Sequence, residues 1–439
     1  MSLTGPPSQT YNEMNFGKGQ VANVDLQRPR GTQDILPSET PIWHRVEGAA
    51  HRVAQSYGYR EIRTPVFEHA EVFRHGVGDA TDIVEKEMYE FEDRGGRTLV
   101  LRPESTAAVA RALQQASLLS EPPVRVYYIQ SHFRYERPQS GRLRQHTQFG
   151  VEAWGVPGPL ADAEVIALAG SFLSELGLTG LVVRLNSLGC DVCRPRYREA
   201  LVTFLQSHRD ELCGDCQRRI ERNPLRVLDC KVPSCQAVVR QGPKPLEYLC
   251  ADCQQHLIGV ETALSALGIT FARDGSLVRG LDYYSRTVFE IGYEKLGAQS
   301  TVCGGGRYDG LLQSLGGKPQ PAVGFGLGLE RLILTLEAEG LLPPAEATID
   351  AFVAYLGPEL GPEAMRIANL LRSAGHRIEM EALGRSLKAQ LRRAQKLSAT
   401  YTVILGPQEF ARGVAVLRNM ETSAQAEVPI QDLPQLIEH

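Results

Sequence analysis

Several common signatures are absent from this 439-residue sequence. There is no GxxxxGK[ST] stretch and no GxGxxG following a strand, so neither a P-loop nor a Rossmann dinucleotide site is predicted. No apolar run reaches membrane-spanning length, because Glu330 and Arg331 interrupt the best candidate. The N-terminal residues lack a basic segment followed by an apolar one. We therefore expect no signal peptide, no membrane partner and a cytoplasmic protein.

Charge of either sign is not in large excess. The formal net charge of -4 excludes neither a nucleic-acid partner nor a small-molecule substrate, because binding depends on local patches. Hydrophobic residues make up 43% of the chain, which is enough for a sizeable core. The length predicts two or three domains.

The cysteines are not spread as in a disulfide scaffold. Eight of the nine lie between Cys190 and Cys253. The Cys-x2-Cys pairs at Cys190 and Cys213 are separated by a spacing typical of zinc sites. The surrounding pattern is helical rather than knuckle-like, so structural zinc is an open alternative and reduced structural thiols are the favoured interpretation. We assign no metal ligands and no catalytic role to these cysteines.

Hydrophobic periodicity indicates the architecture. The segments VRVYYIQSHFRYE and RLRQHTQFGVEAWG alternate as two strands of a hairpin, which favours an antiparallel sheet. Alternating β and α patterns follow residue 350. We predict an α+β core with a mostly antiparallel sheet and a helical insertion, plus a small C-terminal α/β domain. The expected boundaries are a flexible tail at 1–28, the core at 29–344 with the insertion at about 190–265, and the last domain at 345–439.

Three arginines lie at the ends of predicted strands and helices. Arg134, Arg279 and Arg331 occur in HFRYERP, LVRGLDYY and GLGLER. A guanidinium fork matches phosphate geometry and keeps its charge, so these side chains suit an ATP site without a P-loop. Each arginine alone is more often a salt-bridged surface residue.

The same segments resemble a known family. FRYERP with RQHTQFGVE resembles motif 2 of class II aminoacyl-tRNA synthetases, GFGLGLER resembles motif 3, and RTPVFEHAEVF, with Pro65, resembles motif 1. LVRGLDYY and GGGRYDG resemble the two histidine-specific motifs of the histidyl-tRNA synthetase family. RGTQDILP and SLKAQLRRAQK extend the resemblance over residues 29 to 435.

This resemblance implies a histidine–tRNA ligase. Such an enzyme activates L-histidine with ATP and Mg²⁺, releases pyrophosphate, and transfers histidine to the 3′ end of its tRNA. It also implies a homodimer formed through motif 1, a synthetase core and a C-terminal anticodon-binding domain. The main alternative is the synthetase-like regulatory subunit of ATP phosphoribosyltransferase, which typically lacks the C-terminal domain and an intact RGLDYY. A zinc-dependent nucleic-acid-binding module is a third interpretation.

The resemblance assigns roles to individual residues. Arg134, Arg279 and Arg331 are the expected catalytic residues. The positions matched to ATP binding are Arg134, Glu136 and Arg331. Those matched to histidine binding are Glu104, Thr106, Arg134, Gln148, Glu152, Arg279, Tyr283 and Tyr284. Glu152 could instead be a satisfied inward carboxylate, and the two tyrosines could be half-buried strand aromatics. For His132 and His146 we favour a packing role.

Two further sets are expected to contact tRNA. Arg137 and Gln139 match residues that read the acceptor end of the histidine tRNA, and both types suit base-edge contacts. The basic face expected on the anticodon domain consists of Arg385, Lys388, Arg392 and Lys396, at helical spacing. A charged stripe can also be simply a solvated helix face.

Overall fold

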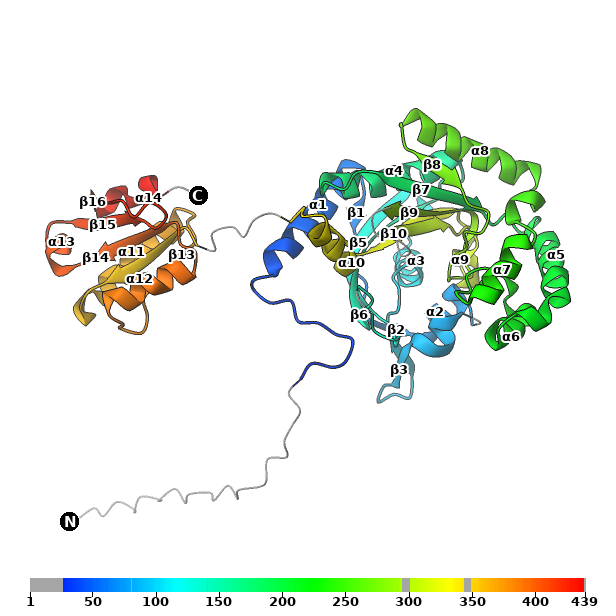
Figure 1. Cartoon of the computed structure of the whole chain (residues 1–439), viewed down its shortest axis with the longest axis horizontal. Coiled ribbons are helices and arrows are strands. Elements are labelled where there is room, and N and C mark those ends of the chain that lie inside the picture. The colour runs from blue at the N-terminus through cyan, green and yellow to red at the C-terminus, as the bar shows by residue number, and fades with distance from the viewer. Residues whose placement is uncertain (1–26, 80, 140, 294–300, 343–348, 438–439) are drawn as a thin grey trace, which may run out of the picture. The chain divides into compact units, whose positions relative to one another are not determined.

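The computed structural model describes residues 27–79, 81–139, 141–293, 301–342 and 349–437 (Figure 1). The chain divides into two compact units, Met1–Leu341 and Leu342–His439, each with its own sheet. The tail expected over 1–28 lies outside the described residues except for its last two positions. No helix in the described part of the chain is long and apolar enough to cross a membrane.

An eight-stranded sheet forms the centre of the first unit. Neighbouring strands are antiparallel except at the two edges, where β1 pairs with β5 and β7 pairs with β8 in parallel. The prediction of a mostly antiparallel sheet is therefore confirmed. In spatial order the strands are β1 (Arg60–Glu61), β5 (Val124–Phe133), β6 (Gln145–Trp154), β11 (Ala322–Gly328), β10 (Thr301–Arg307), β9 (Ser285–Tyr293), β7 (Leu181–Ser187) and β8 (Phe271–Arg273).

Apolar helices cover this sheet. Helix α4 (Pro159–Glu175) is hydrophobic around most of its circumference, as expected of a helix buried between layers. It packs against α8 (Ala251–Ala266), α1 (Thr40–Ser56) and β11. Phe172 of α4 meets Phe149 of β6 with ring centroids 4.9 Å apart. Helix α10 (Leu329–Ala338) packs on β6 and α1.

Three glycines of GGGRYDG, Gly304, Gly305 and Gly306, lie within strand β10. A Cβ on Gly305 would come 2.8 Å from Phe289 Cζ, and one on Gly306 would come 2.9 Å from Tyr284 Cδ1. The glycines are therefore needed because neighbouring groups approach the strand too closely for any side chain.

A three-stranded sheet lies beside the main one. Its order is β2 (Phe67–His69), β4 (Thr98–Leu101) and β3 (Tyr89–Glu92), all antiparallel. Val100 points from β4 into a core shared with α2 (Ala70–Val77) and α3 (Thr106–Gln115). The short segments η1 (Ile83–Glu87), η2 (Leu118–Ser120) and α9 (Leu311–Ser314) complete this region.

The predicted insertion is mostly helical and has its own small core. Figure 1 shows α5, α6 and α7 together beside the main sheet. Tyr197, Leu201, Cys216 and Val238 are among the buried residues of this core. Its elements are α5 (Arg194–Ser207), η3 (Arg209–Glu211), α6 (Gly214–Arg222), η4 (Pro224–Val227), α7 (Pro233–Gln241), η5 (Pro245–Tyr248) and α8.

The second unit is a five-stranded α/β fold. Strands β13 (Ile378–Met380), β12 (Ala351–Tyr355) and β14 (Tyr401–Leu405) are parallel, as the alternating β and α patterns predict. Two antiparallel strands not foreseen from the sequence, β15 (Val414–Asn419) and β16 (Gln425–Pro429), extend the sheet. Its helical segments are η7 (Pro358–Leu360), α11 (Gly361–Ser373), α12 (Leu387–Lys396), α13 (Pro407–Ala411), η8 (Ile430–Asp432) and α14 (Leu433–Leu436).

Candidate active site

A small cavity of about 160 Å³ opens over the middle strands of the main sheet. It joins segments that are far apart in sequence: the start of α3, the inner strands β5, β6, β10 and β11, and the RGLDYY loop. The predicted residues that line it are Glu104, Thr106, Arg134, Gln148, Arg279, Tyr283 and Tyr284. We name it the inner cavity.

Glu152 lies behind the inner cavity rather than on its surface. It is 1% exposed. Its carboxylate accepts hydrogen bonds from Thr106 Oγ1 at 2.8 Å, from the Tyr128 hydroxyl at 3.2 Å and from the Tyr308 hydroxyl. Burial raises the pKa of Glu152 well above its usual value. This environment is that of a satisfied inward carboxylate, one of the two alternatives for this position.

Three tyrosine rings form one wall of the inner cavity. The Tyr283 ring lies 4.7 Å from that of Tyr284 and 5.4 Å from that of Tyr308. Tyr128 and Tyr308 line the same space and were missed as site residues, although Tyr308 belongs to GGGRYDG. Burial raises the pKa of Tyr283 and of Tyr284, so both hydroxyls remain protonated donors.

Glu104 is held at the N-terminus of α3. Its two carboxylate oxygens accept the backbone N–H groups of Thr106 at 2.7 Å and Ala107 at 2.8 Å. This is how a carboxylate caps the unpaired donors of a helix start. The cap fixes Glu104 and Thr106 side by side at the cavity, and each carboxylate oxygen keeps a further lone pair for a ligand.

Arg279 is positioned by a carboxylate and a glycine. Its Nη1 donates to Glu290 Oε1 at 2.6 Å, and Thr301 Oγ1 donates to the other oxygen of Glu290 at 2.7 Å. A Cβ on Gly304 would come 2.6 Å from Arg279 Cζ. The guanidinium therefore lies flat on the bare backbone of β10. No motif or pattern in the sequence indicated a role for Glu290.

A larger cavity of about 610 Å³, which we name the outer cavity, adjoins the inner one. The predicted ATP residues Arg134, Glu136 and Arg331 line it together with Gln148. Arg134 and Gln148 also line the inner cavity. Arg279 and Arg331 thus lie on different cavities, which two shared side chains connect.

Two cations of the outer cavity, Arg142 and Arg331, lie near each other. Arg134 Nε donates to the Pro103 carbonyl at 2.8 Å, which fixes the stem of this side chain. Burial, and secondarily the nearby Arg142, lower the pKa of Arg331 from its ordinary value. Arg142 forms an ion pair with Glu136. Positive charges placed close together at a polar cavity favour the binding of a polyanion such as a triphosphate.

Two histidines lie under this region. His132 is fully buried and its Nε2 lies 2.6 Å from Ser105 Oγ. The His132 and His146 rings are 5.6 Å apart. Burial lowers the pKa of His132 well below its usual value and that of His146 to about 3. Both rings are therefore neutral near pH 7.

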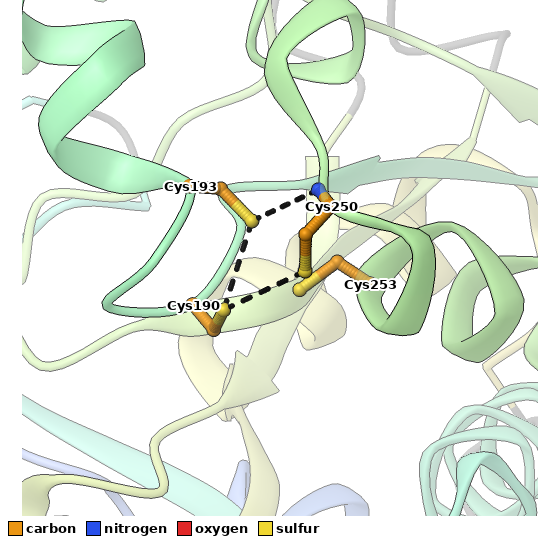
Figure 2. A group of neighbouring side chains, drawn as sticks. All are labelled: Cys190, Cys193, Cys250 and Cys253. Carbon is orange, nitrogen blue, oxygen red and sulfur yellow. Dashed lines mark hydrogen bonds between the residues drawn. The ribbon is translucent and has the colours of Figure 1, made fainter.

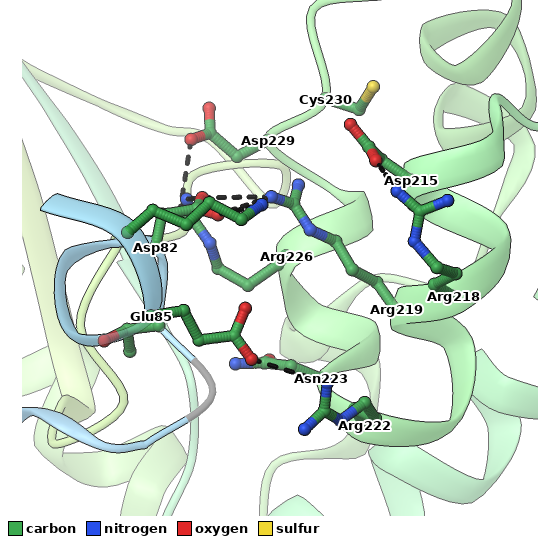
Figure 3. A network of polar contacts seen from close by, with 12 residues as sticks. Asp82, Glu85, Asp215, Arg218, Arg219, Arg222, Asn223, Arg226, Asp229 and Cys230 are labelled. Atoms are coloured by element: carbon green, nitrogen blue, oxygen red, sulfur yellow. Dashed lines mark hydrogen bonds and ion pairs between the residues drawn. The ribbon is translucent and has the colours of Figure 1, made fainter. Parts of the chain in front are cut away.

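The insertion forms part of both the site wall and its support, which the sequence did not reveal. Asp229, Lys231 and Arg240 line the outer cavity. Figure 3 shows Asp82 of the core between Arg219 and Arg226 of the insertion. The Arg219 and Arg226 side chains donate to Asp82 at 2.9 Å and 2.8 Å. Among the described residues, the groups able to hold a metal ion are two sets of four cysteines in the insertion.

The residues expected to contact tRNA are mostly exposed. Arg137 and Gln139 lie between β5 and β6, and the backbone of Gln139 pairs with that of Arg142. Lys388, Arg392 and Lys396 are exposed on α12. Arg385 differs from the expected helical stripe because it precedes α12, and its guanidinium is bound by buried Glu381 at 2.8 Å.

This sheet, the paired polar cavities and the separate α/β unit are those of an aminoacyl-tRNA synthetase. A family model described as histidyl-tRNA synthetase matches residues 31–211 and 227–332, and one described as an anticodon binding domain matches residues 350–439. The chain belongs to the histidyl-tRNA synthetase family.

Individual relatives agree. A histidine–tRNA ligase of Moorella thermoacetica is 53% identical over 92% of this chain and 96% of its own length. One of Caldanaerobacter subterraneus is 48% identical over 94% of this chain and 99% of its own. A solved structure of apo S. aureus histidyl-tRNA synthetase has 34% identity and a TM-score of 0.80, covering 94% of this chain and 99% of that one.

Proposed function

We propose that this chain catalyses the histidine–tRNA ligase reaction, with histidine activation taking place across the inner and outer cavities. It is an aminoacyl-tRNA synthetase whose substrates are L-histidine, ATP and tRNA. The regulatory-subunit alternative is less supported, because relatives matched over more than nine-tenths of the chain are named ligases and the anticodon-binding domain is present.

The observation that carries this proposal is the connection of the two cavities by Arg134 and Gln148. Activation requires the histidine carboxylate to attack the α-phosphorus of ATP while the bond to pyrophosphate breaks. Negative charge on the phosphoryl oxygens must be stabilised where the two substrates meet. Arg134 is the guanidinium present on both sides of that point, so we assign it to the α-phosphate.

Arg279 and Arg331 act on either side of Arg134. Arg279 lies in the inner cavity, where it faces the histidine carboxylate and the α-phosphate. Arg331 lies in the outer cavity, where it binds the γ-phosphate, while Glu136 is assigned to the adenine side. Mg²⁺ prefers oxygen ligands and keeps several of its waters. Among the described residues no group of carboxylates is gathered to hold this ion by itself, so phosphate oxygens of ATP and water would supply most of its ligands, and the ion would neutralise phosphate charge.

Histidine occupies the inner cavity. Its ammonium group is bound by the acceptors Glu104, Thr106 and Gln148. Its imidazole needs one acceptor and one donor, because neutral imidazole carries one N–H and one bare nitrogen. Tyr284, with Tyr283 beside it, supplies the hydroxyl. Glu152 accepts the N–H of the imidazole ring, which replaces one of the two tyrosine hydroxyls that now donate to this carboxylate.

The tRNA-contacting residues and the dimer belong to the same proposal. Arg137 and Gln139 read the acceptor end, and the exposed cations Lys388, Arg392 and Lys396, with Arg385 beside them, meet the anticodon stem. The three-stranded sheet supports a homodimer. Phe67 and Phe91 lie on the same face of this sheet, where they pair across the strands with Leu101 and Leu99 of β4. Their side chains are 56% and 43% exposed. An exposed apolar face of this kind marks a protein interface.

A pyrophosphate-exchange assay tests the activity. Histidine-dependent exchange between ATP and labelled pyrophosphate, measured without tRNA, is expected for the ligase. Charging of tRNA with labelled histidine tests the second step. A folded chain that shows neither reaction would contradict the proposal and restore the regulatory-subunit alternative.

A further inference from the structure

Eight of the nine cysteines converge into two groups of four within the insertion. The first cysteine set is Cys190, Cys193, Cys250 and Cys253, and the second cysteine set is Cys213, Cys216, Cys230 and Cys235. Within each set all four sulfurs lie within 4.8 Å of one another. Figure 2 shows the first set drawn together from the start of α5 and the start of α8. We propose that each set binds one structural zinc ion.

The sulfur separations match a tetrahedral site. Cys190 Sγ lies 3.6 Å from Cys193 Sγ and 3.9 Å from Cys250 Sγ, and Cys213 Sγ lies 3.9 Å from Cys230 Sγ. Four thiolates at about 2.3 Å from a central zinc are separated by about 3.8 Å along each tetrahedral edge. A disulfide would require about 2.05 Å. All of these thiols are free.

The chain around each set is arranged to support thiolates. Cys250 and Cys213 stand at the N-termini of α8 and α6, and Cys253 and Cys216 lie in the first turns of those helices. Backbone N–H groups point at sulfur as well: that of Cys250 donates to Cys193 Sγ at 3.2 Å. In the second set the N–H of Cys213 donates to Cys235 Sγ at 3.1 Å. Such donors offset the two net negative charges that four thiolates leave around a divalent ion.

The spacing also excludes an iron–sulfur cluster. In a four-iron cluster each cysteine binds a different iron, so the four sulfurs must surround a much larger body. Sulfurs within 4.8 Å of one another leave space for a single ion. Zinc suits this place because it binds four thiolates tetrahedrally. It is also redox-inactive, and a structural site needs no redox chemistry.

The structure replaces the pairing suggested by sequence spacing. The Cys190 and Cys213 pairs, neighbours along the chain, belong to different sets. The first set joins the entry of the insertion to the start of its last helix, α8, 60 residues later. The second set closes the segment that carries Arg219 and Arg226, the two arginines that hold Asp82 of the core. One ion therefore fixes the insertion where it leaves the main sheet, and the other fixes the segment that contacts Asp82 of the core.

Metal content tests the proposal directly. The full-length chain is purified under reducing conditions without added metal, and its zinc is measured by mass spectrometry. Release by a mercurial thiol reagent in the presence of a zinc-binding dye gives the same number without any mutation. We expect two zinc ions per chain. Growth in cobalt should replace them and produce the intense sulfur-to-cobalt absorption of tetrathiolate sites.

Three serine variants assign the ions. Cys253→Ser and Cys216→Ser should each remove one of the two ions. Cys303→Ser is the matched control, because Cys303 is a buried thiol outside both sets and its loss should leave two ions bound. A folded, reduced chain without bound metal would overturn the proposal, as would iron in place of zinc. One ion per chain, removed by only one variant, would overturn the site that the other variant tests.

Discussion

The side-chain amide of Asn223 donates to both carboxylate oxygens of Asp282, at 2.9 and 3.2 Å. Asp282 directly precedes Tyr283 and Tyr284 at the inner cavity, whereas Asn223 belongs to the insertion. Asp282 is also held from the core, since its N–H donates to the Val77 carbonyl at 3.1 Å. The loop that is proposed to bind histidine is therefore anchored partly by an element that lies outside the main sheet.

Removing this anchor should weaken histidine binding. In Asn223→Ala the half-buried Asp282 loses two hydrogen bonds, and a bond to a charged group contributes about 1.5–3 kcal/mol. We expect KM for histidine to rise by about tenfold, with a smaller change in kcat, in the pyrophosphate-exchange assay. Arg222→Ala is the control, because Arg222 is 73% exposed and pairs with Glu85 at 3.5 Å. Equal effects in the two variants would refute a role for the anchor.

Gly304→Ala should displace Arg279. The three nearest atoms to a Cβ at Gly304 all belong to the Arg279 guanidinium, so the arginine must move while the strand remains in place. The exchange rate should fall by about a hundredfold, the usual effect of losing one transition-state donor. Gly310→Ala is the matched control, since a Cβ there meets nothing within 4 Å. A Gly304→Ala enzyme with normal kcat would contradict the catalytic role that is proposed for Arg279.

Direct replacement of Arg279 should separate binding from chemistry. We expect Arg279→Ala to retain nearly normal histidine binding, measured by calorimetry, and to lose about 3 kcal/mol of transition-state stabilisation. Arg279→Lys keeps the charge but not the planar guanidinium fork, so its exchange rate should lie between those of the wild-type enzyme and Arg279→Ala. Parallel loss of affinity and rate in Arg279→Ala would show that the residue serves ground-state binding instead.

Acid should destabilise the first unit through its buried histidines. The pKa of His146 is about 3 in the folded chain, against about 6.5 for an unfolded histidine. Below pH 6.5 the unfolded chain takes up a proton that the folded chain does not, so the free energy of unfolding falls by about 1.4 kcal/mol per pH unit for each such group.

His146→Asn should therefore show a shallower decline in stability between pH 6.5 and pH 5. Urea unfolding followed by fluorescence at several pH values measures this slope. Exposed His44 provides the comparison, and His44→Asn should retain the wild-type slope. A His146→Asn slope equal to that of wild type would mean that this ring is protonated in the folded chain.

Phe67→Ser should weaken the proposed dimer. This side chain is 56% exposed on the face that it shares with Phe91. Sedimentation velocity should show a dimer for the wild-type chain and a shift toward monomer for the variant. Leu383→Ser changes another exposed apolar residue, 75% accessible in the second unit, and should leave the dimer intact. A wild-type chain that sediments as a monomer would contradict the proposed homodimer.

Elements with strong local patterns were predictable. The β5–β6 hairpin and the mostly helical insertion follow from alternation, turn residues and periodicity. The two strands β15 and β16 were missed, because their burial is weak and their pairing depends on the rest of the sheet. The need for the glycines of β10 could not be read from the sequence, since the close approach of Tyr284 and Phe289 that requires them is a tertiary contact.

The candidate site was predictable by motif but not by contact. Most of the matched positions line one of two connected cavities, yet Glu152 lies behind the surface and is already hydrogen-bonded. Glu290 has no local signal, because its importance comes from Arg279, which lies on another segment. The grouping of the cysteines also depends on the fold, because sequence spacing suggests partners that the insertion separates.

Arg134 and Gln148 line both cavities. Under the proposed assignment of substrates, a single compound with an imidazole at one end and a purine nucleoside at the other would reach past these two side chains from one cavity into the other. A stable sulfamoyl-linked mimic of this kind would combine the contacts of amino acid and nucleotide in one binding event. Inhibitor design for this enzyme can therefore start from the junction and grow in both directions.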